Sequence, residues 1–320
     1  MTGGMGYLGG RIILKLLEET QFELRVTTHK VKRTLPGRLK KDHVIPVDMM
    51  SEADLAAACR DIQSIIHLAA LNETESGSNP EQALLVNSLG TLKLLRAAEK
   101  AGVKKLIYFS TIHVYGTPLT GRITEETLPR PIHPHPITHR TAEDFVLDAH
   151  GRKVLSGIVL RLSNAFGAPD YPDLERWTLV VNDLCRQAVT CRKMELHSSG
   201  LQRRDFITLE DVARAALHFL HLPAPQFGDG LFNLGGENSM RIIDMAELIS
   251  SRCRKVLGFT PEIVKPEPKQ NEPSEELNYC IDKLKATGFR LQGKIDEEID
   301  QTLKFCVRAF GNPSVKAARS

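Results

Sequence analysis

Thr2-Gly3-Gly4-Met5-Gly6-Tyr7-Leu8-Gly9 is the stretch that decides the fold of this 320-residue chain. Its glycines are spaced G-x-x-G-x-x-G, and an amphipathic helical pattern from Arg11 to Leu17 follows at once. The first glycine permits a turn with positive φ, the second lets a pyrophosphate approach the backbone, and the third lets the helix pack closely on a sheet. The free N–H groups at the start of that helix favour phosphate. We therefore expect a dinucleotide-binding turn here.

A turn of this kind normally connects a buried strand to its helix, yet only Met1 precedes the motif. The next strand is expected at Leu24 to Thr28, where a βαβ unit requires it. The absent strand would be about five apolar residues long. Its loss would leave N–H and C=O groups of the neighbouring strands unpaired in the core. The sequence thus predicts a native chain that starts a few residues earlier and binds its cofactor better than this form.

Composition limits the function classes. A net charge of +3 is too small to indicate a nucleic-acid or membrane-surface partner. The sequence has no apolar run long enough to span a bilayer and no signal-peptide pattern. Six cysteines are scattered without a C-x-x-C pair, which argues against metal or disulfide use and indicates a cytoplasmic location.

Short apolar runs alternate with helical patterns through the first half. Strands are expected at 44–47, 64–68, 105–109 and 157–162, and helices at 80–101 and 141–149. This alternation predicts an α/β fold with a doubly wound, Rossmann-type parallel sheet. We expect a dinucleotide-binding domain over 1–165 and a smaller α/β substrate-binding lobe over 166–320, from which about 204–235 return to the core. Helices are expected in that second part at 209–220, 242–256 and 294–310.

Several further motifs occur in a fixed order: His67-Leu68-Ala69-Ala70, Asn87-Ser88-Leu89-Gly90-Thr91, Ser110-Thr111-Ile112-His113-Val114-Tyr115-Gly116, Arg161 to Gly167, Gln202 to Ile207, and Phe232-Asn233-Leu234-Gly235. Together with the glycine turn they resemble the extended short-chain dehydrogenase/reductase family, in its nucleotide-sugar epimerase/dehydratase branch. The resemblance covers residues 2 to about 290.

The resemblance implies roles for particular residues. Thr111 corresponds to the catalytic Ser/Thr that hydrogen-bonds the reacting sugar oxygen, and Asn164 and Arg204 correspond to residues that bind the sugar diphosphate. The alternative for these three is a purely structural role at strand ends and loop starts. The implied cofactor site comprises Gly3, Gly6, Tyr7, Leu8, Gly9, Thr28, His29, Lys30, Asp48, Met49, Leu68, Ala69, Ala70, Asn87, Ser110 and His139. The resemblance also implies a homodimer that packs helices 80–101 and 141–149 of both subunits together.

The chain departs from the family at its catalytic pair. Family members carry P-Y-x-x-[ST]-K-x-x-x-E, in which the tyrosine is the general acid/base and the lysine holds the nicotinamide ribose. Aligning Pro134, Thr138 and Glu143 with this pattern places His135 at the tyrosine and His139 at the lysine. Imidazole, whose ordinary pKa is about 6.5, can exchange a proton near neutral pH. His113 is a third candidate base, with a packed strand-end histidine as its alternative.

The same comparison narrows the reaction. The 4,6-dehydratase branch has an Asp-Glu pair directly after the catalytic Ser/Thr, where this chain has Ile112 and His113. Hydride transfer at a ring carbon, by a 4-epimerase or a 4-ketoreductase, therefore remains. The turn Thr28-His29-Lys30, followed by Lys32 and Arg33, lacks the acid that would bind the ribose 2′-OH, which favours NADP over NAD.

Two classes of function stay open. One is an NAD(P)-dependent nucleotide-sugar epimerase or ketoreductase. The other is a catalytically degenerate protein that binds a dinucleotide or nucleotide sugar as a sensor or scaffold, which the missing Tyr/Lys pair would explain.

Overall fold

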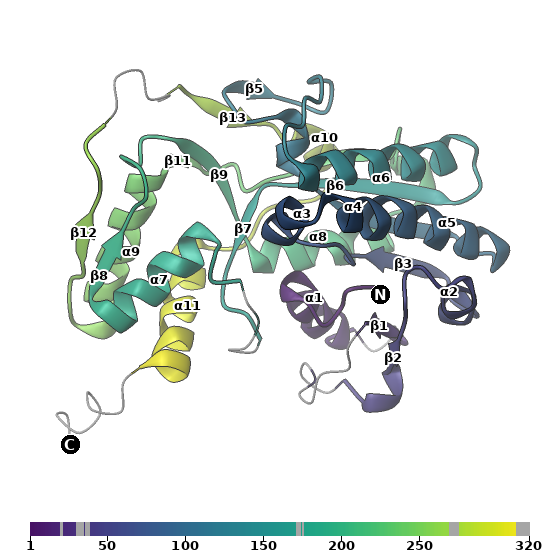
Figure 1. Cartoon of the computed structure of the whole chain (residues 1–320), viewed down its shortest axis with the longest axis horizontal. Coiled ribbons are helices and arrows are strands. Elements are labelled where there is room, and N and C mark those ends of the chain that lie inside the picture. Colours follow the sequence, from purple (N-terminus) through teal and green to yellow (C-terminus); the bar gives the residue numbers. More distant parts are fainter. Residues whose placement is uncertain are drawn as a thin grey trace.

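A parallel sheet forms the centre of the computed structural model, which describes residues 1–19, 22–29, 35, 39–170, 174, 176–268 and 275–311 (Figure 1). Four of its strands lie in the order β10-β6-β4-β3, namely β10 (Leu231–Leu234), β6 (Ser156–Leu162), β4 (Lys105–Thr111) and β3 (Ser64–His67). A second parallel pair consists of β1 (Val26–Thr28) and β2 (Val44–Pro46). The predicted α/β class with a parallel sheet is confirmed.

Thr2 joins these two groups of strands. It forms parallel bridges with Thr27 of β1 and with His67 of β3. The Thr2 N–H donates to the Ile66 carbonyl at 2.9 Å, and the Leu68 N–H donates to the Thr2 carbonyl at 3.2 Å. The position expected for the first strand is thus held by one bridged residue, directly before the glycine turn.

Successive side chains of a strand point to opposite faces of the sheet. Both faces of this sheet carry apolar side chains, and helices cover both. Ile107 and Phe109 of β4 pack on one side with α1 and α8, whereas Leu106 and Tyr108 pack on the other with α2, α5 and α6. These helices span Tyr7–Leu17 (α1), Leu209–His221 (α8), Glu52–Cys59 (α2), Gly90–Lys100 (α5) and Pro134–Gly151 (α6).

Two predicted helices are present but differ in detail from the prediction. Helix α6 begins at Pro134 rather than near Thr141, because the His133 ring caps it by accepting the His135 N–H and because proline suits the first helical turn. The single helix expected over 80–101 consists of α4 (Pro80–Ala83), a π-helical segment at Leu84–Leu89 (η2) and α5.

The carboxyl-terminal part forms a second core around α7 (Val180–Cys191), α9 (Ile242–Leu257) and α11 (Ile295–Phe310). Its strands are β7 (Asn164–Phe166), β8 (Lys193–Glu195), β9 (Arg203–Thr208), β11 (Ser239–Arg241) and β12 (Glu262–Val264). The chain returns to the main sheet at β10.

Smaller elements complete the fold: α3 (Glu73–Ser78), β5 (Gly121–Ile123), β13 (Leu277–Tyr279), α10 (Asp282–Ala286), and the 3-10 turns η1 (Lys41–His43), η3 (Ile112–Tyr115) and η4 (Ala224–Gln226). Within the described ranges, no helix combines the length and the apolar character needed to cross a bilayer.

Candidate functional site

The glycine turn has the backbone geometry that its sequence predicts. Gly3 has φ +63°, and a Cβ added there would lie 2.7 Å from the Ala69 nitrogen. A Cβ on Gly9 would overlap the Gly4 carbonyl. Gly6 is the N-cap of α1 and provides no side-chain cap, so the first N–H groups of the helix, beginning with Tyr7 and Leu8, are left for an anion. This cradle fits a pyrophosphate.

The loop after β3 is fastened against that turn. The Thr2 hydroxyl accepts the N–H groups of Leu68 and Ala69, both at 3.3 Å, and donates to His67 Nδ1 at 2.6 Å. On its other side the His67 ring donates from Nε2 to Thr91, whose hydroxyl donates to the Asn87 carbonyl. Burial lowers the pKa of His67 to about 3, so the ring is neutral and this hydrogen-bond chain has one direction.

The other predicted cofactor residues lie at the carboxyl ends of strands, where parallel sheets bind ligands. Thr28 ends β1 and His29 follows it, while Asp48 and Met49 follow β2. Lys30, Lys32 and Arg33, on which the NADP expectation partly rests, lie outside the described residues. Ala70 lies in the loop after β3.

Asn87 and Ser110 are predicted cofactor residues whose side chains bind protein groups. The Asn87 amide accepts the Leu71 N–H at 2.7 Å and donates to the Thr138 hydroxyl at 3.0 Å, which ties η2 to α6. The Ser110 hydroxyl donates to Glu143 at 2.5 Å. Both side chains therefore hold the framework of the site in place.

Thr111 and His113 lie side by side at the end of β4. Thr111 is 9% exposed. Its hydroxyl accepts the His113 N–H at 3.2 Å, and this leaves its own proton free for another acceptor. Burial lowers the pKa of His113; Glu73 opposes the shift, and Arg204 and His133 add to it. The His113 ring is therefore neutral at physiological pH and lies near ionisable groups of three other segments.

His135, at the position of the family's tyrosine, lies in the first turn of α6. Its Nδ1 is 3.2 Å from the Leu71 carbonyl oxygen. Because a carbonyl only accepts, Nδ1 carries the proton and Nε2 has a free lone pair. Burial lowers the pKa of His135 to about 4, although the Leu71 carbonyl and Glu73 oppose the shift. The ring is thus a neutral base.

His139, at the position of the family's lysine, is one helical turn further on, with its ring centroid 4.4 Å from that of His135. Its Nδ1 is 2.6 Å from the Tyr108 hydroxyl, and its buried Nε2 has no hydrogen-bond partner among the described residues. Burial holds the pKa of His139 well below its usual value. An unpaired buried nitrogen at the place that the resemblance assigns to the nicotinamide ribose fits a ribose hydroxyl.

The predicted substrate residues Asn164 and Arg204 lie on strands β7 and β9 of the carboxyl-terminal part. The Asn164 amide donates to the Asp205 carbonyl at 2.9 Å, from β7 to β9. Arg204 is half-buried; its hydrogen bond to Gln202, at 3.5 Å, is long, and among the described residues no carboxylate lies within ion-pairing distance. Burial lowers the pKa of Arg204, and Glu73 opposes that shift. A guanidinium held in this way is ready to bind an anion.

Arg176 is a residue that the sequence did not reveal. Burial lowers its pKa, while Glu75 and Tyr7 oppose the shift, so this guanidinium lies near the start of α1. It also adds to the lowered pKa of His135. Arg176 belongs to no motif, and only the folded chain brings it to the site.

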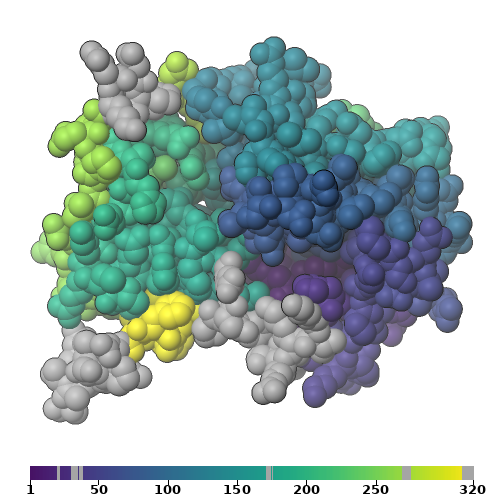
Figure 2. Space-filling model, in the orientation of Figure 1, coloured from purple at the N-terminus to yellow at the C-terminus, as the bar shows by residue number. Residues whose placement is uncertain are grey.

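The surface of the molecule has a hollow between its two parts (Figure 2). In Figure 2 the blue helices α3 and α4 face the teal carboxyl-terminal part across it, and the purple amino-terminal segment lies recessed beside them. Among the described residues, no group of three His, Cys, Asp or Glu side chains is arranged to hold a metal ion.

Comparison with known proteins agrees with this geometry. The chain is 25% identical to the dTDP-D-glucose 4,6-dehydratase of Mus musculus over 98% of its own length and 89% of the relative's. It is 28% identical to the UDP-glucose 4-epimerase of Bacillus subtilis, over 81% and 83% of the two chains.

Solved structures share the fold. The UDP-glucuronic acid 4-epimerase from Bacillus cereus, in complex with NAD, has a TM-score of 0.80 at 21% identity and covers 96% of this chain and 95% of its own. A family model described as the NAD dependent epimerase/dehydratase family matches residues 1–235. The predicted resemblance is confirmed, and the chain belongs to the NAD dependent epimerase/dehydratase family.

Proposed function

We propose that this protein is an NAD(P)-dependent nucleotide-sugar epimerase or 4-ketoreductase that transfers hydride at a ring carbon of its substrate. The observation that carries the proposal is Arg204, a half-buried guanidinium without a carboxylate partner in the described ranges. It is electrostatically coupled to His113, two residues from Thr111. A diphosphate is the anion whose oxygens suit this fork, and the sugar attached to it would reach Thr111.

The cofactor would be held by residues of the glycine turn, the loop at 68–70 and His139. A bound nicotinamide dinucleotide supplies a hydride acceptor or donor. NADP stays the favoured form because neither Thr28 nor His29, at the end of β1, offers a carboxylate to the ribose 2′-OH.

We assign the role of general base to His135. Its Nδ1–H is engaged with the Leu71 carbonyl, so Nε2 would accept the proton of a substrate hydroxyl as that hydroxyl is oxidised. The free proton of Thr111 would donate to the same oxygen and hold it in place. With a pKa of about 4, His135 is unprotonated throughout the neutral range.

The test is hydride transfer with matched arginine variants. The protein is mixed with NADPH or NADH and a panel of UDP-, GDP- and dTDP-4-keto sugars, and absorbance at the reduced-cofactor band is followed. Arg204→Met should raise the KM for the sugar nucleotide at least about tenfold, as expected when a charged hydrogen bond is lost. The control is Arg203→Met, because Arg203 pairs instead with Glu276. Equal effects of both substitutions would contradict the assignment of Arg204.

A second candidate function has its own observation. His139 is neutral where the family resemblance places a lysine cation. A protein that binds the same ligands without turnover would be consistent with this neutral site. Ligand-induced thermal shifts with no hydride transfer across the whole panel would favour it over the enzyme.

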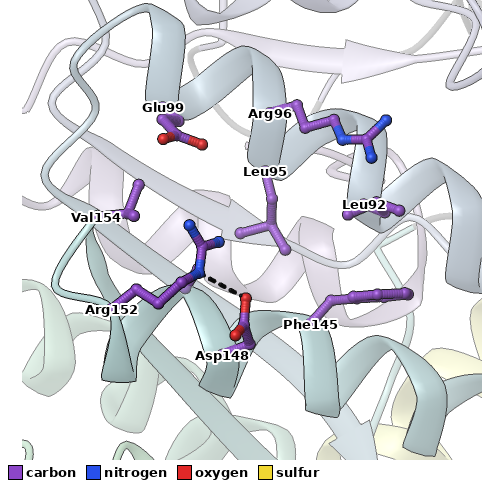
Figure 3. A pocket seen from close by; sticks show the side chains of 9 residues that line it. Leu92, Leu95, Arg96, Glu99, Phe145, Asp148, Arg152 and Val154 are labelled. Carbon is purple, nitrogen blue, oxygen red and sulfur yellow. Dashed lines mark hydrogen bonds and ion pairs between the residues drawn. The ribbon is translucent and has the colours of Figure 1, made fainter.

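We further propose a homodimer through α5 and α6. A groove of about 340 Å³ runs between these helices, and Figure 3 shows Leu92, Leu95 and Phe145 in it, with Arg96 above and the Asp148–Arg152 pair below. A second copy would bury the apolar side chains and pair the mixed charges. Light scattering should give a dimer mass, and Phe145→Glu should give a monomer. The control Lys100→Ala, outside the groove, should remain dimeric.

The cytoplasm stays the proposed location, since all six cysteines are free thiols.

A further inference from the structure

Tyr108 is a buried residue of β4 to which no family motif gives a role. Its hydroxyl lies 2.6 Å from His139 Nδ1, and the two rings are 5.7 Å apart and tilted by 30°. Tyr108 is 2% exposed and His139 5%. The neighbouring His67 ring, 5.4 Å from Tyr108, already uses both nitrogens on Thr2 and Thr91. The hydrogen bond to His139 is therefore the one that the structure offers the Tyr108 hydroxyl among the described residues.

The direction of this hydrogen bond follows from counting unsatisfied groups. If Tyr108 donates to Nδ1, His139 carries its proton on Nε2, and one buried group is left without a partner in the described ranges. If Nδ1 donates instead, both the Tyr108 proton and the Nε2 lone pair are left unpaired. Each unpaired buried group is costly, so the first arrangement is favoured. His139 then presents an N–H donor.

The neighbouring His135 presents a hydrogen-bond acceptor where His139 presents a donor. His135 donates from Nδ1 to the Leu71 carbonyl and so presents a lone pair on Nε2. The two rings meet edge to face with centroids 4.4 Å apart. One turn of α6 thus presents an acceptor and a donor next to each other.

We propose that Tyr108 is a positioning residue that fixes His139 as its Nε2–H tautomer, so that His135 and His139 form an acceptor–donor pair for the hydroxyl groups of a bound polyol. A hydroxyl, or a vicinal diol such as that of a ribose, donates to His135 Nε2 and accepts from His139 Nε2–H. The identification of the polyol as cofactor ribose or substrate sugar rests on the proposed function. The tautomer assignment does not.

The tautomer can be read directly from the full chain. In ¹⁵N-labelled protein at pH 7.5, long-range ¹H–¹⁵N spectra distinguish Nδ1–H from Nε2–H histidines, and His139→Gln assigns the signal. We expect His139 as pure Nε2–H. Tyr108→Phe should convert it to a mixture of tautomers, whereas Tyr279→Phe, which removes another buried hydroxyl bonded to Arg161 and Asn233, should leave it unchanged. An Nδ1–H signal in the unsubstituted chain would overturn the proposal whether or not the variants fold.

Binding provides the second readout. Fluorescence titration with NADH and NADPH should show about 3- to 10-fold weaker binding for Tyr108→Phe, the factor expected from one neutral hydrogen bond, and no change for Tyr279→Phe. If the unsubstituted chain binds neither dinucleotide, the proposed function fails while the spectra still decide the tautomer. If binding is intact in Tyr108→Phe and the tautomer is unchanged, the role of Tyr108 is refuted.

Discussion

Mild acid should destabilise this protein strongly, because three buried histidines must stay neutral. Burial lowers the pKa of His67 to about 3 and that of His135 to about 4, and it holds the pKa of His139 well below its usual value. In the unfolded chain each ring titrates near 6.5. Between those values the unfolded state binds more protons than the folded state, so the stability contributed by each neutral ring is complete above pH 6.5 and is lost as the pH falls.

The size of the effect follows from these pKa values. Going from pH 7.5 to 5.5, protonation stabilises an unfolded histidine of pKa 6.5 by about 1.4 kcal/mol, while a folded histidine with a pKa of 4 or lower gains almost nothing. His67 and His135 together give about 3 kcal/mol, a large part of the roughly 5–15 kcal/mol that stabilises a typical protein. His139, whose pKa burial also lowers, adds to the loss in the same direction. Burial raises the pKa values of Asp205 and Glu298, which acts in the opposite sense at lower pH, so pH 5.5 is the better limit.

Urea unfolding at a series of pH values between 5.5 and 7.5 measures this loss. Trp177, the single tryptophan, contacts Phe310 and reports on the carboxyl-terminal part, and far-UV circular dichroism reports on the whole chain. His67→Asn should reduce the slope of unfolding free energy against pH by about one proton near pH 5.5. The control His197→Asn, at an exposed position, should leave it unchanged. A free energy of unfolding that stays constant from pH 7.5 to 5.5 would refute the reasoning.

Three further predictions concern the framework and the site. Glu143→Ala should destabilise the fold by about 3–5 kcal/mol in urea titrations, because it leaves the buried Arg161 guanidinium without its carboxylate; Asp144→Ala, on the exposed side of the same helix, should cost less than about 1 kcal/mol. Gly9→Ala should weaken dinucleotide binding at least about tenfold in fluorescence titrations, because its methyl group would displace the Gly4 carbonyl of the cradle. Thr111→Val should lower kcat about 10²-fold while thermal-shift affinity for sugar nucleotides stays within about threefold, since the lost donor acts on the reacting oxygen; a change confined to KM would contradict that role.

The fold was predictable because it rests on local patterns. The runs Ser64–Ile66 and Lys105–Phe109 could be identified as strands because each is short and largely apolar. The start of α6 was not predictable in this way. Its first turn contains prolines and histidines, which carry no helical periodicity, and its cap is a histidine ring rather than a serine or aspartate.

The site was predictable only as far as its motifs reach. Gly3, Thr111 and Arg204 are found from spacing and resemblance. The part played by Asn87 could not be found, because its amide is engaged by Leu71 and Thr138, which are 16 and 51 residues away. Arg176 and Tyr108 were missed for the same reason. Each matters through a neighbour that the sheet and α6 bring to it, and no spacing in the sequence records that contact.

The surroundings of His139 explain why a neutral ring can stand where the family has a cation. Glu143, one turn further along α6, is already paired with Arg161 through two nitrogens and also accepts from Ser110. The ring itself faces Tyr108, a neutral phenol whose pKa is raised by burial. An ammonium placed there would be buried without a free carboxylate, which costs several kcal/mol. A histidine that receives the Tyr108 proton and presents its own N–H keeps the donor and avoids the buried charge.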